Sequence, residues 1–191
     1  MACAGIAAGY LIGRQSGAGR SSSVSAKSGD GSPQELAANG TANSNAATAV
    51  KGRITYKNDE GDSRPDRKAR VLVFPQQREG QRKLDITGFR GGDAAEDFRS
   101  AAAAFHALGG GASVVNDDGS FEISLPAAGT YHILVLSNYQ PRDTDETTDG
   151  PLMNLLAQYF DRPEQLLGRV AYHFGQVRYK GAEPVLWDHS F

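Results

Sequence analysis

The chain has a single cysteine, Cys3, among its 191 residues, so no disulfide can form within it. It has no uninterrupted apolar stretch of about 20 residues, the length of a membrane-spanning helix. Its 20 basic and 22 acidic residues give a net charge of -2, which argues against the basic surface of a nucleic-acid-binding protein. We therefore expect a domain held together by core packing alone, with no nucleic-acid partner.

Patterns that carry chemistry are also scarce. The chain lacks a Gly-x-Ser-x-Gly nucleophile motif and a phosphate-binding glycine loop. None of the four histidines stands at a spacing typical of metal ligands. The sequence therefore predicts no catalytic residue, no metal and no cofactor, and we expect that the protein is not an enzyme.

What the chain does contain is a clear β pattern over residues 116–137. Asp118-Gly119 has the composition of a tight turn. Phe121, Ile123 and Leu125 then alternate with polar residues, which is the period of a half-buried strand. Residues 131–136 begin another strand. The pattern predicts a mainly β fold.

Three regions differ in composition. Residues 1–13 are uncharged, with glycines at four-residue spacing, a pattern that lets membrane helices pack closely. They are either the end of a membrane anchor that starts upstream or a disordered apolar tail. Residues 14–48 are rich in Gly, Ser, Ala and Asn and predict a disordered tether. The sequence predicts that residues 49–191 form the folded β-sandwich domain.

Two amphipathic segments interrupt the strands. Residues 93–108 begin with a capping-box pattern at Asp93 and Glu96 and carry one apolar stripe at helical spacing. Residues 151–167 carry a second stripe. The sequence predicts an inserted helix and a C-terminal helical segment at these positions.

The predicted strands over residues 71–74 and 131–136 are apolar on both faces, although a free-standing sandwich exposes one face of each sheet. We expect the two helical segments to cover the second face of that sheet. A partner protein is the alternative cover.

One or two further strands follow residue 167. Apolar residues occupy even positions (170, 172, 174) and then odd positions (177, 179). This change of phase at Gly175-Gln176 predicts either a β-bulge or a tight turn between two strands.

The segments 50–56, 69–75 and 118–131 together resemble the carboxypeptidase regulatory-like family, over about residues 49–140. The resemblance implies a seven-stranded prealbumin-like (transthyretin-like) sandwich and an accessory or ligand-presenting role, with no catalytic residues to transfer. One enzyme of this fold, the transthyretin-like hydroxyisourate hydrolase, ends in Tyr-Arg-Gly-Ser. This chain ends in His189-Ser190-Phe191, so hydrolysis is only a remote alternative.

We therefore expect a non-catalytic, membrane-tethered sandwich, facing outside the cytoplasm, that binds or scaffolds in the cell envelope. Its expected partner is an envelope protein or a glycan. The alternative is a carbohydrate- or peptide-binding module. Tyr139 and Trp187 are candidate ligand contacts, since exposed aromatic rings can stack on sugars. His132 and His173 are further candidates, because they lie on predicted strands where they could meet.

Overall fold

The structure is a computed structural model, and it describes residues 47–143, 145 and 147–191. The predicted anchor and the predicted tether up to residue 46 lie outside the described residues. The described part contains nine strands and three helices. In chain order these are β1 (Thr48–Lys57), β2 (Ser63–Pro65), β3 (Arg70–Pro75), α1 (Ala95–His106), β4 (Gly111–Val114), β5 (Ser120–Ser124), β6 (Gly129–Pro141), α2 (Gly150–Tyr159), α3 (Pro163–Leu167), β7 (Val170–Tyr179), β8 (Val185–Leu186) and β9 (His189–Ser190).

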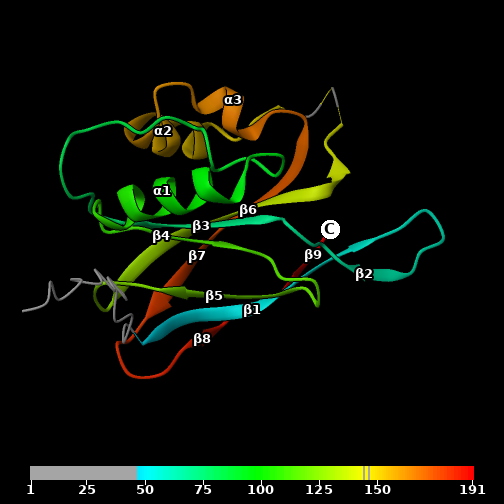
Figure 1. Cartoon of the computed structure of the whole chain (residues 1–191), viewed down its shortest axis with the longest axis horizontal. Coiled ribbons are helices and arrows are strands. Elements are labelled where there is room, and N and C mark those ends of the chain that lie inside the picture. Colours follow the sequence, from blue (N-terminus) through cyan, green and yellow to red (C-terminus); the bar gives the residue numbers. More distant parts are fainter. Residues whose placement is uncertain (1–46, 144, 146) are drawn as a thin grey trace, which may run out of the picture. The chain divides into compact units, whose positions relative to one another are not determined.

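The strands form two sheets that pack face to face. The order of the four-stranded antiparallel sheet is β4-β3-β6-β7. In the other sheet, β1 pairs antiparallel with β2 and β5 and parallel with β8 and β9. Figure 1 shows the helices on one side of the four-stranded sheet and β1, β5 and β8 on the other. The predicted mainly β sandwich with added helices is confirmed.

The first core fills the space between the sheets. Val71 and Val73 of β3 stand opposite Val135 and Ile133 of β6, and all four are fully buried there. Because side chains alternate along a strand, the residues between them face the other side of the sheet. The alternation in the sequence therefore assigns each residue to one of two cores.

The second core lies between the four-stranded sheet and the helices. Leu72 and Leu134 face it from the sheet, and Phe105 of α1 and Leu156 of α2 are completely buried in it. Burying such a side chain contributes roughly 1.5–3 kcal/mol. The expectation that the two helical segments cover this face is confirmed.

The predicted capping box of the inserted helix is wrong. Helix α1 begins at Ala95 with no side-chain cap. The carboxylate of Asp93 instead accepts hydrogen bonds from the backbone N–H groups of Gly88 (2.7 Å) and Arg90 (3.0 Å). It also pairs with the Arg90 guanidinium at 2.9 Å. Asp93 therefore stabilises the loop before the helix, and Glu96 has no capping partner.

The phase change at Gly175-Gln176 marks neither a bulge nor a turn. Strand β7 is continuous, and its pairing with β6 keeps one register from Tyr172 to Tyr179. Its first half packs against the helical core through even positions, and its second half packs into the core between the sheets through odd positions. The apolar residues change faces because the covering layer changes along the strand.

Candidate functional site

Strand β6 leaves the register of its neighbour near its end. Leu136 pairs with Tyr172 and Pro141 pairs with Val170, so residues 137–140 stand opposite Ala171 alone. The extra residues must bend out of the sheet, as in the special bulges that insert more than one residue. This bend carries Tyr139, one of the four predicted contact residues.

Two polar side chains support the bend from inside. Asp66, which is fully buried, accepts a hydrogen bond from the Ser137 hydroxyl (2.6 Å) and one from the Asn138 backbone N–H (3.0 Å). The Ser137 Oγ in turn accepts from the backbone N–H groups of Tyr139 (3.2 Å) and Gln140 (2.9 Å). Burial raises the pKa of the Asp66 carboxyl above its usual range, although the hydrogen bond from Ser137 opposes this shift.

The bend places the Tyr139 ring flat on the ring of Tyr56, with centroids 4.9 Å apart and planes 19° apart. Tyr139 remains 49% exposed. Tyr56 continues the face of β1 that carries Ile54 into the core, and Arg64 of β2 stands directly opposite Tyr56. We call Tyr56, Tyr139 and Arg64 the tyrosine ledge. In Figure 1 the β1–β2 hairpin projects to the right, beyond the other strands of the sandwich.

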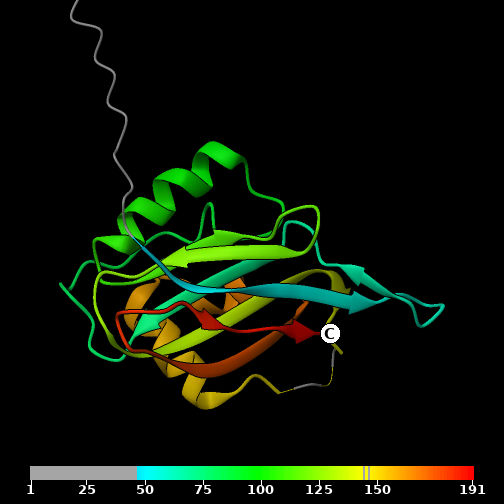
Figure 2. The same ribbon diagram turned by 90° about the horizontal axis from the view of Figure 1, so that it is seen from below.

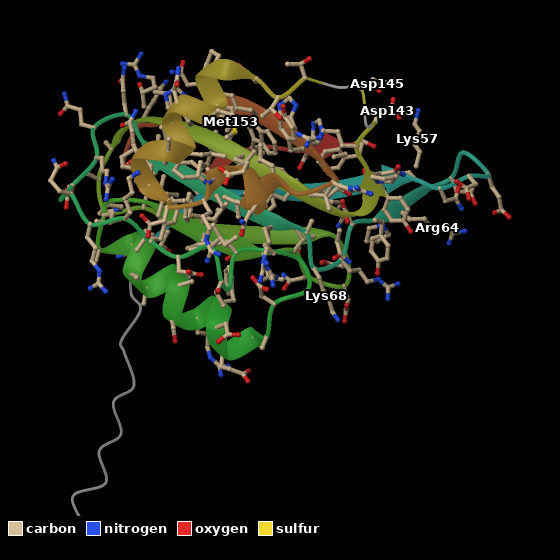
Figure 3. The ribbon with its side chains drawn as sticks, turned by 90° about the horizontal axis from the view of Figure 1, so that it is seen from above. Lys57, Arg64, Lys68, Asp143, Asp145 and Met153 are labelled. Carbon is tan, nitrogen blue, oxygen red and sulfur yellow. The ribbon has the colours of Figure 1, made fainter. Side chains whose placement is uncertain are left out.

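Charged groups of both signs lie at the same end of the domain as Arg64 of the ledge. Figure 3 shows Lys57, Arg64, Asp143 and Asp145 at the same end of the domain. Arg64 forms an ion pair with Asp62 at 3.1 Å, and both side chains are more than half exposed. The ledge thus combines an apolar ring face with donors and acceptors, the combination by which proteins hold a polyhydroxyl ligand.

The structure also brings together two other predicted contacts, His173 and Trp187, whose ring centroids lie 5.6 Å apart. The ring of His189 stacks on His173 at 4.1 Å and lies 5.9 Å from Trp187, and Phe191 meets His189 edge-on at 4.6 Å. We call these four residues the C-terminal ring cluster. Trp187 and Phe191 are partly buried and pack against the core between the sheets. Trp187 therefore contributes to core packing and does not present a freely exposed ring to a ligand.

Burial favours the neutral form of the imidazoles in this cluster. Burial lowers the pKa of His173, and burial together with the neighbouring His173 lowers the pKa of His189 to about 4. Across the described residues no group of three His, Cys, Asp or Glu side chains is arranged to hold a metal ion. The cluster is therefore suited to packing.

His132 lies apart from this cluster. It stands opposite Gln176 in the β6–β7 pairing, whereas His173 stands opposite Val135. Since neighbouring positions on a strand face opposite ways, the two histidines lie on opposite faces of the sheet. His132 stacks on Phe174 at 5.5 Å. The meeting of His132 and His173 that the sequence left open does not occur.

The outer face of β1 carries two adjoining hollows of about 460 and 280 Å³, which share Arg53 and Asp188. Figure 2 views this side, where the C-terminal segment runs beside β1. Asp188 Oδ1 accepts a hydrogen bond from the Arg53 backbone N–H at 2.7 Å. Leu186, 73% exposed, contributes the apolar surface here.

Several of these residues escaped the sequence analysis. Tyr56, Asp66 and Ser137 carry no local motif, because their partners are distant in the chain. Arg64 forms its ion pair with Asp62 nearby, in a pattern typical of any polar hairpin. The inward position of His189 could have been predicted, because residues 185–191 alternate between apolar or aromatic and other side chains, as in a half-buried strand.

No protein-family model matches this chain, and no curated protein matches it. One solved structure is similar, that of a protein from Pseudomonas aeruginosa named as a candidate carbohydrate binding protein. The similarity covers 76% of this chain and 90% of that one, at 11% sequence identity and a TM-score of 0.40.

Proposed function

We propose that the domain is a non-catalytic carbohydrate-binding module and that the tyrosine ledge is its contact surface. The observation that carries the proposal is the half-exposed ring of Tyr139, held flat on Tyr56 by a bend in β6. A ring fixed in this way loses little conformational entropy when a ligand stacks on it. The guanidinium of Arg64, on a side chain that is more than half exposed, supplies nearby donors for sugar hydroxyl groups.

The histidines give little support to a hydrolytic alternative. A general acid or base must reach the reacting group and have a pKa near the working pH. His132 and His173 lie on opposite faces of the sheet, and the pKa of His189 is about 4. We therefore retain binding as the proposal over a transthyretin-like hydrolase.

We further propose that residues 1–13 anchor the domain to a membrane, that residues 14–48 tether it, and that it works in the cell envelope as a member of the carboxypeptidase regulatory-like family. The uncharged, glycine-spaced N-terminus supports the anchor. Within the described residues, no helix is both long and apolar enough to cross a bilayer. Fractionation of the protein expressed from its native genomic locus tests this proposal: recovery with the membranes would support it, and recovery in the soluble fraction would refute it.

The test of the binding proposal measures retention on a panel of soluble polysaccharides: neutral glucan, mannan and xylan, and a uronic-acid polymer. We expect at least one to bind, and we expect Tyr139→Ala to weaken its binding by about 30-fold, the equivalent of a 2 kcal/mol contact. Leu186→Ala is the matched control, since it truncates an exposed apolar side chain opposite Lys51, away from Tyr56 along β1, and should leave binding unchanged.

Two results would overturn the proposal. If wild-type protein binds no polysaccharide of the panel, the ledge is not a glycan site, and a peptide ligand or an envelope protein becomes the candidate partner. If a polysaccharide binds equally well to wild type and to Tyr139→Ala, the glycan site lies elsewhere on the domain.

A further inference from the structure

A buried carboxylate connects the two sheets directly beneath the tyrosine ledge. The backbone N–H of Asp66 donates to the carbonyl of Ile54 in β1 at 3.0 Å, and its side chain accepts hydrogen bonds from the bend in β6. Asp66 thus holds the strand that carries Tyr56 and the bend that carries Tyr139. It is fully buried, so water does not compete for these hydrogen bonds.

The backbone N–H groups of the bend donate to the Asp66 carboxylate and to the Ser137 hydroxyl, which itself donates to Asp66. Residues 138–140 have left the β7 register, and their N–H groups need other acceptors. Asn138 donates directly to Asp66, and Tyr139 and Gln140 donate to the Ser137 Oγ. A hydroxyl that accepts two hydrogen bonds has used both lone pairs, so its single proton is left for Asp66, 2.6 Å away.

We propose that Asp66 is the positioning residue of the tyrosine ledge. Its ionised carboxylate orients the Ser137 hydroxyl, and this hydroxyl holds the backbone of Tyr139 and Gln140. The ring of Tyr139 is thereby held on Tyr56, in position to bind a ligand. Its consequence for ligand binding rests on the proposed function. The geometric part, that Asp66 orders the bend, stands without any ligand.

The geometric part is tested by hydrogen exchange in Asp66→Asn. The variant replaces two acceptor oxygens by one acceptor oxygen and one donor nitrogen, so either the Ser137 hydroxyl or the Asn138 N–H loses its acceptor. We expect the amides of residues 138–140 to exchange at least about tenfold faster, while the amides of Ile133 and Val135 in the same strand keep their protection. Asp161→Asn, an exposed carboxylate beside the helices, is the matched control. Unchanged exchange at residues 138–140, or an equal rise along all of β6, would overturn the proposal.

The binding part is tested by a double-mutant cycle on the polysaccharide that wild type retains. Asp66→Asn should weaken binding by about tenfold, or 1.4 kcal/mol, in the wild-type background and not at all in the Tyr139→Ala background. Equal losses in both backgrounds would mean that Asp66 acts on the domain as a whole, and would refute the proposal.

Ser137→Ala serves as the second variant if Asp66→Asn does not fold. It keeps the carboxylate and removes the acceptor of Tyr139 and Gln140, so it should raise exchange at those two amides more than at Asn138. Equal exchange at all three would refute the proposed relay. If wild type binds no polysaccharide, the proposed function fails, and the exchange measurements still decide whether Asp66 orders the bend.

Discussion

Acidification should weaken the domain through the C-terminal ring cluster. The rings of His173 and His189 stack at 4.1 Å in a partly buried site beside Trp187. Protonating either imidazole there places a cation in a poorly solvated position, and protonating both places two cations in contact. In the unfolded chain both rings take up a proton freely near pH 6.5.

The direction and size of this change in the free energy of unfolding follow from the lowered pKa of His189. Between pH 6.5 and about 4 the unfolded chain binds a proton that the folded chain rejects, so stability falls as the pH falls through this window. At 1.36 kcal/mol for each pH unit, complete rejection would cost about 3.4 kcal/mol at pH 4. Since the ring is partly exposed, solvent screening reduces this, and we expect a loss of about 1–2 kcal/mol.

Urea unfolding at pH 7.5 and pH 4.5 measures the effect. His189→Phe keeps a flat ring in the cluster and cannot titrate, so its stability should fall less between the two pH values than that of wild type. His106→Gln, on an exposed part of α1, is the control. The raised pKa of Asp66 favours the folded state on acidification, which opposes the effect of the histidines in wild type. The difference between wild type and His189→Phe removes this contribution, because both proteins contain Asp66. An identical pH dependence in wild type and His189→Phe would refute the reasoning.

Two further predictions concern packing. Leu156→Ala opens a cavity under α2 and should lower the free energy of unfolding by about 2–5 kcal/mol, whereas Leu155→Ala, at a half-buried position, should lower it by less than about 2 kcal/mol. Urea unfolding of both variants measures these losses. Equal losses would contradict the assignment of Leu156 to the buried face of α2. Gly52→Ala would bring a Cβ to 1.7 Å from the Trp187 carbonyl oxygen, so residues 185–191 should lose amide protection at a cost of about 1–3 kcal/mol, and unchanged exchange there would contradict the close approach.

The layers of this fold could be predicted because they depend on alternation within single strands. Residues 71–74 and 131–136 are apolar on both faces, which already requires a covering layer, and amphipathic helices were available in the same chain. The phase change in β7 was visible but was misinterpreted. A strand whose cover changes halfway gives the same pattern as a bulge, and only the packing of the other layers separates the two.

Less of the candidate site than of the fold could be predicted from the sequence. Tyr139 was identified as an exposed aromatic residue, but its support comes from Tyr56 and Asp66, which no local pattern connects to it. Trp187 was expected to be exposed, yet its place in an alternating segment turns it toward the core. Contacts between distant segments decide which aromatic ring faces solvent, and these contacts follow from the topology.

The parallel pairing of β8 and β9 with β1 constrains how the protein is made. A hydrogen bond joins Arg53 to Asp188 across 135 positions of the chain, so β1 leaves the ribosome long before the segment that completes its edge. During synthesis that edge presents unpaired backbone groups, which attract other strands. We therefore expect the domain to reach its final form only after residues 185–191 have been translated.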